Sequence, residues 1–115
     1  MTWGTVELEP EVVRWLEGLS DEKFGHVAFY IDMLEEQGVH LAEPYSRQLL
    51  GKLRELRFFV GRERVRVSYF IASGRRIVLL TVFRKTRQRE ELEIMRADRA
   101  MRRCIAERHL EVEAE

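Results

Sequence analysis

The chain has 115 residues, of which 45% are hydrophobic and 35% charged, and its formal net charge is zero. This length and composition predict a single globular domain over residues 1–115 and argue against wholesale disorder. The sequence has no apolar run long enough to span a bilayer, no basic leader and a single cysteine, so we expect a soluble cytoplasmic protein without an internal disulfide.

The N-terminal third is expected to form a strand and two helices. Residues 3–8 predict a short strand, and Pro10 follows at the first position of a helix, where its missing N–H costs nothing. Ser20 predicts the capping residue of a second helix, which Gly38 ends. The apolar residues of this helical hairpin recur at helical spacing: Val12, Val13, Leu16, Leu19, Phe24, Val27, Ala28, Ile31 and Leu34.

The middle of the chain changes to a period of two. Residues 56–60, 65–71 and 77–83 are rich in strand-forming residues, and glycine-containing turns at 61–63 and 73–75 separate them. They predict an antiparallel meander of three strands. Alternation in the second strand places Val65, Val67, Tyr69 and Ile71 on one face, and Arg64, Arg66, Ser68 and Phe70 on the other.

Residues 90–108 predict a final helix, with Ile94, Ala97, Met101, Cys104 and Ile105 on its apolar side. The order of elements is then β-α-α-β-β-β-α. This order predicts an α+β fold in which the helical hairpin and the C-terminal helix pack on one face of a small antiparallel sheet. The other face is expected to be free for function.

The charges are sorted along the chain. Residues 1–46 carry 2 Lys/Arg against 10 Asp/Glu, residues 47–89 carry 13 against 2, and residues 90–115 carry 5 against 8. Residues 47–89 are hereafter the basic segment. A cationic stretch between acidic ends indicates a surface that binds a polyanion such as a nucleic acid.

Strand alternation decides which cations of the basic segment can act together. In each expected strand one cation shares a face with an aromatic ring: Arg57 with Phe59, Arg66 with Phe70, and Lys85 with Phe83. If these faces coincide, guanidinium groups can bind phosphate oxygens and the rings can stack on bases. The alternative is a solvated basic sheet, whose arginines prevent edge aggregation and whose rings belong to the core.

Other kinds of site find little support in the sequence. The three histidines, His26, His40 and His109, lie outside the basic segment, and none has metal-ligand spacing with Cys104. There is no glycine-rich phosphate loop and no Ser/His/Asp signature. We therefore expect neither a metal nor a cofactor.

Three motifs of the basic segment occur in the order of a known superfamily. They are Glu55-Leu56-Arg57, then Arg66 followed three residues later by Tyr69, then Phe83-Arg84-Lys85-Thr86. Together with the acidic hairpin before them and the helix after them, they make the chain similar to the RelE/ParE toxin superfamily. The resemblance is closest to its HigB-like, phage-derived branch, and it covers nearly the whole chain.

The resemblance implies the toxin of a type II toxin–antitoxin system. Such toxins are endoribonucleases that cut messenger RNA, often in the ribosomal A site, and so inhibit translation. They use no metal, because the 2′-hydroxyl of the RNA attacks the adjacent phosphate and leaves a cyclic phosphate and a 5′-hydroxyl. The implied partners are mRNA, the ribosome and a cognate antitoxin of the helix-turn-helix type.

The resemblance also assigns roles to single residues. Arg57 and Arg66 match the arginines that hold and stabilise the phosphate, and Lys85 matches a lysine that acts as base or charge stabiliser. Tyr69 matches a motif tyrosine, but alternation puts it opposite Arg66 and so in the core. The residues implied to bind RNA are Lys52, Arg64, Phe83, Arg84 and Arg87.

Two other functions remain open at this point. Relatives of the ParE type inhibit DNA gyrase by binding and cut nothing. A non-enzymatic reading makes the chain an inactive interaction module, whose basic face docks an acidic protein. Acidic helices and a basic sheet can also pair between copies, which would give a salt-sensitive homodimer.

Overall fold

A computed structural model describes residues 1–86 and 90–113. Along the chain the elements are β1 (Thr5–Leu8), α1 (Pro10–Glu17), α2 (Asp21–Gln37), the short 3₁₀-helix η1 (Gly38–His40), β2 (Ser46–Leu50), β3 (Leu53–Val60), β4 (Glu63–Ala72), β5 (Arg76–Arg84) and α3 (Glu90–Arg108). The expected α+β class is confirmed. Within the described residues no helix has the length and apolar character needed to cross a membrane.

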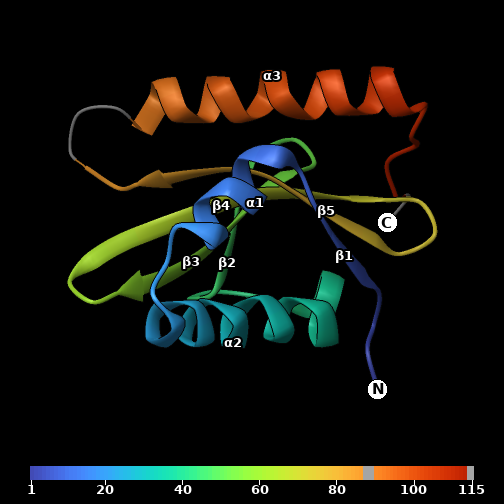
Figure 1. Ribbon diagram of the computed structural model, residues 1–115. Helices are drawn as coiled ribbons and strands as arrows, with labels where there is room; N and C mark the ends of the chain where they lie inside the picture. The colour runs from blue at the N-terminus through green and yellow to red at the C-terminus, as the bar shows by residue number, and fades with distance from the viewer. Residues whose placement is uncertain (87–89, 114–115) are drawn as a thin grey trace.

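The helices cover both faces of the sheet, so the expectation that they share one face was wrong. Figure 1 shows α3 along one side of the sheet and α2 along the other. The reason is that the long strands are apolar on both sides. Val67 and Leu79 belong to the core beneath α1 and α2, whereas Phe70 and Val78 belong to the core beneath α3. Each apolar face needs a helical cover to leave water.

The sheet has five strands in the order β1-β5-β4-β3-β2 and is mixed rather than purely antiparallel. The meander of β3, β4 and β5 is antiparallel as expected, but β1 pairs with β5 in parallel. The edge strand β2 was missed by the sequence analysis. It is short, carries exposed polar residues and has an irregular register between Gln48 and Leu50, so its alternation is weak.

The register of the sheet fixes the faces of the basic residues. Arg57 lies directly opposite Arg66, and Arg66 lies opposite Phe83 on the next strand. Residues that face each other across strands point to the same side. This side is the one that carries α3, because Leu53 and Phe70 on the same strand faces pack beneath that helix.

The expected ends of the helical hairpin are confirmed. Pro10 occupies the first turn of α1, and the Ser20 hydroxyl accepts a hydrogen bond from the Lys23 backbone N–H at 3.3 Å. Gly38 ends α2 with a φ of +51°, and a Cβ at this position would overlap the Trp3 ring. Glycine therefore allows both the left-handed turn and the close approach of the N-terminal segment.

Candidate functional site

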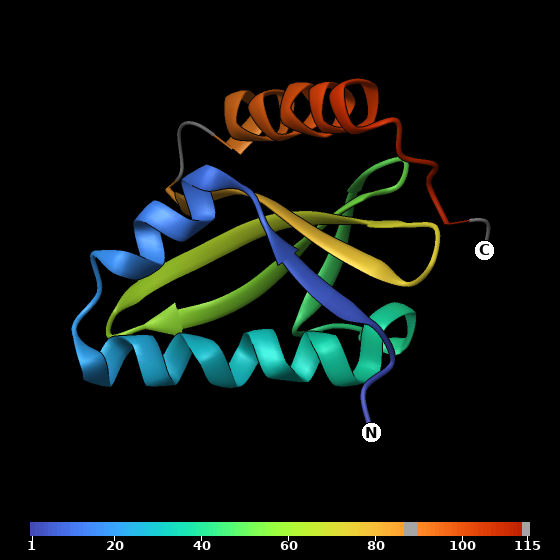
Figure 2. The same cartoon turned by 45° about the vertical axis from the view of Figure 1, so that its right-hand side comes forward.

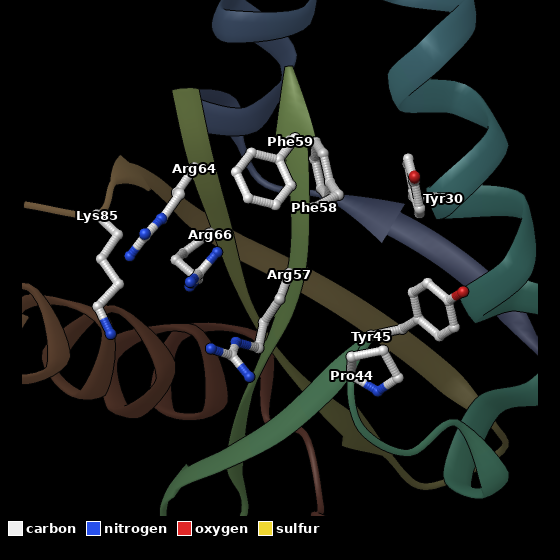
Figure 3. Close-up of a pocket in the computed structure, with 9 residues that line it drawn as sticks. All are labelled: Tyr30, Pro44, Tyr45, Arg57, Phe58, Phe59, Arg64, Arg66 and Lys85. Atoms are coloured by element: carbon white, nitrogen blue, oxygen red, sulfur yellow. The ribbon is translucent and has the colours of Figure 1, made fainter. Parts of the chain in front are cut away.

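A cleft of about 370 Å³ lies beside the second half of β3. Strand β2 pairs with β3 only as far as Leu56, and the Arg57 N–H then donates to the Tyr45 carbonyl at 2.9 Å. Beyond this point the edge of β3 is not covered by β2. The cleft, hereafter the basic cleft, is lined by Tyr30, Pro44, Tyr45, Arg57, Phe58, Phe59, Arg64, Arg66 and Lys85 (Figure 3).

The cations of three neighbouring strands meet in this cleft. Arg57 comes from β3, Arg66 from β4 and Lys85 from the residue after β5, and Figure 3 shows their side chains together with Arg64 on one side of β3. The Lys85 N–H donates to the Arg64 carbonyl at 2.8 Å, which continues the pairing beyond β5. The expected convergence of Arg57, Arg66 and Lys85 is therefore present in the fold.

The two central arginines share one buried carboxylate. Glu55 is 1% exposed, and its Oε2 lies 3.4 Å from Arg57 Nε and 3.6 Å from Arg66 Nε. None of these atoms, nor Glu55 Oε1, has a hydrogen-bond partner within the described residues. Glu55 thus compensates the charge of both arginines at a distance without saturating their donors. In the sequence Glu55 stood out only as part of the Glu55-Leu56-Arg57 motif and was given no role of its own.

Burial works against the ionisation of Glu55 and of Arg66. It raises the pKa of the Glu55 carboxyl, and the charges of Arg66 and Arg57 oppose that rise. It lowers the pKa of Arg66, and the Glu55 charge opposes that fall. Glu55 and Arg66 therefore depend on neighbouring opposite charges to stay ionised in the interior.

Arg57 and Lys85 each have one further, weak carboxylate partner. Arg57 Nη1 lies 3.5 Å from the exposed Glu43, and Lys85 Nζ lies 3.5 Å from Glu90. Both distances exceed those of strong charge-assisted hydrogen bonds. Within the described residues no carboxylate lines the cleft itself, and the Glu55 carboxylate lies buried behind Arg57 and Arg66.

An aromatic wall completes the cleft on the other side of β3. Tyr30 from α2 stacks on Phe58, with ring centroids 5.0 Å apart and planes at 8°, and Tyr45 lies next to Tyr30. Phe59, 57% exposed, projects on the cationic side. Sequence reasoning missed Tyr30, Pro44 and Tyr45 because they precede the basic segment and follow no strand alternation that could place them here.

Several residues expected to bind RNA lie elsewhere. Phe83 is 6% exposed and Phe70 is fully buried beneath α3, so neither ring is open to stack on a base. Arg84 points to the face opposite Lys85 and pairs with Glu63 at 2.5 Å. Lys52 lines a different cavity. Arg87 lies outside the described residues.

Tyr69 lies in the core as expected, on the face opposite Arg66 and 1% exposed. Its hydroxyl lies 2.6 Å from the buried Ser46 hydroxyl, within hydrogen-bond distance. Within residues 1–86 and 90–113, no group of three or more His, Cys, Asp and Glu side chains is arranged to hold a metal ion.

Residues 14–104 match the family model described as Phage derived protein Gp49-like, and the chain belongs to this family. No curated protein matches the chain by sequence. Two solved structures share its fold. A mutant of the Escherichia coli toxin RelE in the free state has a TM-score of 0.60 and 10% identity, over 90% of this chain and 98% of that one.

The second solved structure is the archaeal RelE-RelB complex from Pyrococcus horikoshii. Its matching chain has a TM-score of 0.52 and 23% identity, over 73% of this chain and 97% of that one. These identities establish a shared fold. The family match confirms the expected similarity to phage-derived proteins, and the two structures confirm the expected RelE-like fold.

Proposed function

We propose that this member of the Gp49-like family is the toxin of a toxin–antitoxin pair and an endoribonuclease that cuts messenger RNA in the basic cleft. The observation that carries the proposal is the pair Arg57 and Arg66, opposite each other on neighbouring strands, whose Nη2 nitrogens form no hydrogen bond within the described residues. Such a pair matches a phosphodiester that gains negative charge as it reacts. The RelE-like fold supports the same conclusion.

The reaction assigned to the cleft is a transesterification within the RNA strand. The 2′-oxygen forms a bond to the adjacent phosphorus, the bond from phosphorus to the 5′-oxygen breaks, and one proton moves from the 2′-hydroxyl to the leaving oxygen through bases and acids of the site. Arg57 and Arg66 bind the non-bridging oxygens. Lys85 acts as base or charge stabiliser, and the exposed Phe59 ring offers a stacking surface to a base.

An antitoxin and the ribosome are the proposed partners. RelE of Pyrococcus horikoshii occurs in a complex with RelB, and the shared fold supports an equivalent proteinaceous antitoxin here. The basic cleft is open along the edge of β3, which suits an extended RNA strand. Cleavage in the ribosomal A site would present such a strand already unpaired.

The test is an mRNA cleavage assay with purified protein, run with and without translating ribosomes. We expect cuts that carry a cyclic phosphate and a 5′-hydroxyl. Lys85→Ala should reduce the rate by about 10²-fold or more, because a charge that acts on the transition state is lost. Arg84→Ala is the matched control, since it removes the adjacent cation on the opposite face and should leave the rate unchanged.

Each other outcome points elsewhere. Folded protein that cuts no mRNA under either condition overturns the nuclease proposal, and accumulated DNA breaks would then identify a gyrase inhibitor. Equal loss in Lys85→Ala and Arg84→Ala would mean that the total charge matters rather than the basic cleft. Cuts that require ribosomes establish the ribosome as part of the substrate.

A further inference from the structure

A second cavity, of about 360 Å³, lies at the end of the sheet where the C-terminal segment packs. Figure 2 shows η1, the β2–β3 turn and the C-terminal segment at this same end of the molecule. The cavity shares no lining residue with the basic cleft. Its polar wall consists of His40, Gln48, Lys52, Arg54 and Glu113.

Arg54 is held in place from behind by two buried hydroxyls. Its Nε donates to Ser46 Oγ at 3.0 Å, and that oxygen lies 2.6 Å from the Tyr69 hydroxyl. Ser46 is fully buried and Tyr69 is 1% exposed. The three residues come from three adjacent strands, with Tyr69 directly opposite Arg54. The core thus fixes one edge of the guanidinium.

The rest of this guanidinium is available to a ligand. Among the described residues, nothing forms a hydrogen bond or ion pair with the two terminal nitrogens of Arg54. A planar guanidinium with its Nε anchored presents these nitrogens as a fork, which matches two oxygens of a phosphate. Water can solvate a partly exposed arginine without a pair of buried hydroxyls. We therefore interpret the Ser46 and Tyr69 hydroxyls as groups that orient the Arg54 guanidinium.

The neighbouring groups add positive charge and shape. Lys52 is exposed in the tight β2–β3 turn, and the Gln48 side-chain amide holds this turn by donating to the Gly51 carbonyl at 2.6 Å. Glu113 is the sole carboxylate on the wall among the described residues, and its Oε2 accepts from the Arg75 backbone N–H at 3.4 Å. Lys52 and Arg54 therefore share the wall with one carboxylate, Glu113, which already accepts a hydrogen bond.

We propose that this cavity is a phosphate-binding site, in which Arg54 binds two phosphate oxygens and Lys52 supplies a second positive charge. The phosphate can be carried by the backbone of a nucleic acid or by a free nucleotide. Tyr69 is then a positioning residue that acts through Ser46. The site stands on its own contacts, whether or not the basic cleft cuts RNA.

The experiment is an NMR titration of the full chain with inorganic phosphate at constant ionic strength. We expect saturable shifts of the Arg54 Nε–H and of the Gly51 and Lys52 amides. Arg54→Gln should weaken this binding about tenfold or more, because charge-assisted hydrogen bonds are lost. The matched control Arg62→Gln removes an exposed turn cation outside the cavity and should bind as the wild type does.

Two further variants keep the proposal falsifiable if Arg54→Gln does not fold. Lys52→Gln changes an exposed turn residue and should weaken phosphate binding, whereas Glu113→Gln should strengthen it. Absence of saturable shifts at the cavity, or equal binding by Lys52→Gln and Arg62→Gln, would overturn the proposal.

The source of the phosphate is decided by two parallel titrations, one with a mononucleotide and one with a 2′-O-methyl RNA strand that cannot be cut. Stronger binding of the strand, with a salt dependence that decreases in Lys52→Gln, identifies a nucleic acid backbone. Stronger binding of the mononucleotide identifies a free nucleotide. If neither ligand shifts the Arg54 Nε–H, the site is not a phosphate site.

Discussion

Two groups of arginines in this molecule differ in how their charges are matched. The first group is Arg76, Arg96 and Arg108, around β1, α1, β5 and α3. Together with their partners Glu7 and Glu11 they are hereafter the paired network. Arg76 donates to Glu7 at 2.7 and 3.1 Å, and Arg96 donates to Glu11 at 2.5 Å. Arg108 binds the same Glu7 carboxylate. These guanidinium groups tie distant elements together.

The second group is the pair Arg57 and Arg66 in the basic cleft. They lie 3.4 and 3.6 Å from one buried carboxylate, and none of the facing atoms is hydrogen-bonded within the described residues. The facing Nε atoms are buried, but the Nη2 nitrogens of Arg57 and Arg66 form no hydrogen bond within the described residues, so these terminal donors are left for a ligand. The comparison therefore assigns the paired network to stability and the arginines of the cleft to function, although both use the same residue types.

The largest effect on stability is expected at Glu55, the buried carboxylate behind Arg57 and Arg66. Glu55→Lys places a third cation in the interior against Arg57 and the buried Arg66, which should cost about 3–5 kcal/mol of unfolding free energy. Thermal denaturation should show a Tm lower by roughly 10 °C or more. The matched control is Glu63→Lys, whose partner Arg84 is exposed, and it should cost at most about 1 kcal/mol. Equal costs would show that the cleft is no different from the surface.

A smaller effect is expected in the paired network. Arg96 donates to Glu93 at 2.9 Å and to the Val82 carbonyl at 3.1 Å in addition to Glu11, so it connects α3 with β5 and α1. Arg96→Gln should cost about 1 kcal/mol, since the side chain is partly exposed and screened. Urea denaturation measures this change in unfolding free energy. Arg103→Gln, which removes an exposed cation of α3 with a partner 4.0 Å away, should cost less.

The smallest effect is a pH dependence of the paired network. The hydrogen bond from Arg76 is the main reason why the pKa of Glu7 falls from its ordinary 4.5 to about 2. A lowered carboxyl pKa gives stability that is complete above pH 4.5 and is lost as pH falls towards 2. The loss should be about 1 kcal/mol, because Glu7 lies near the surface. Unfolding measured across this window should be flatter in Glu7→Gln than in Glu36→Gln.

The raised pKa of Glu55 acts in the opposite direction. A carboxyl that holds its proton more tightly in the folded chain lowers stability as pH rises above its ordinary value. Glu7 therefore affects the stability of the fold at acid pH, and Glu55 affects it towards neutral pH. Glu55→Gln should flatten the neutral side and leave the acid side, which Glu7 governs, unchanged.

Strand alternation was the part of the site that the sequence could predict. A period of two is local, so it placed Arg64 and Arg66 on one face of β4 and Tyr69 on the other before any tertiary contact was known. It also separates Lys85 from Arg84, although the resemblance implied that both act on the RNA. Alternation alone shows which residues share a face, and it does not show which face a helix covers.

The rest of the cleft depends on contacts between distant segments. Phe83 shares the face of Arg66 but lies under neighbouring side chains, so alternation could not distinguish an open ring from a buried one. Tyr30 and Tyr45 reach the cleft from α2 and from the segment before β2. Glu55 was visible as a neighbour of Arg57, but its burial between two arginines is set by the register of β3 and β4.

The most direct test of the comparison measures mRNA cleavage and Tm together for Arg57→Gln and Arg96→Gln. Arg57→Gln should cut about 10²-fold or more slowly while remaining folded, because it loses a donor to the reacting phosphate. Arg96→Gln should cut at the wild-type rate with a lowered Tm. The reverse pattern, or equal loss of cleavage in both, would contradict the assignment of unsaturated arginines to function and saturated ones to the fold.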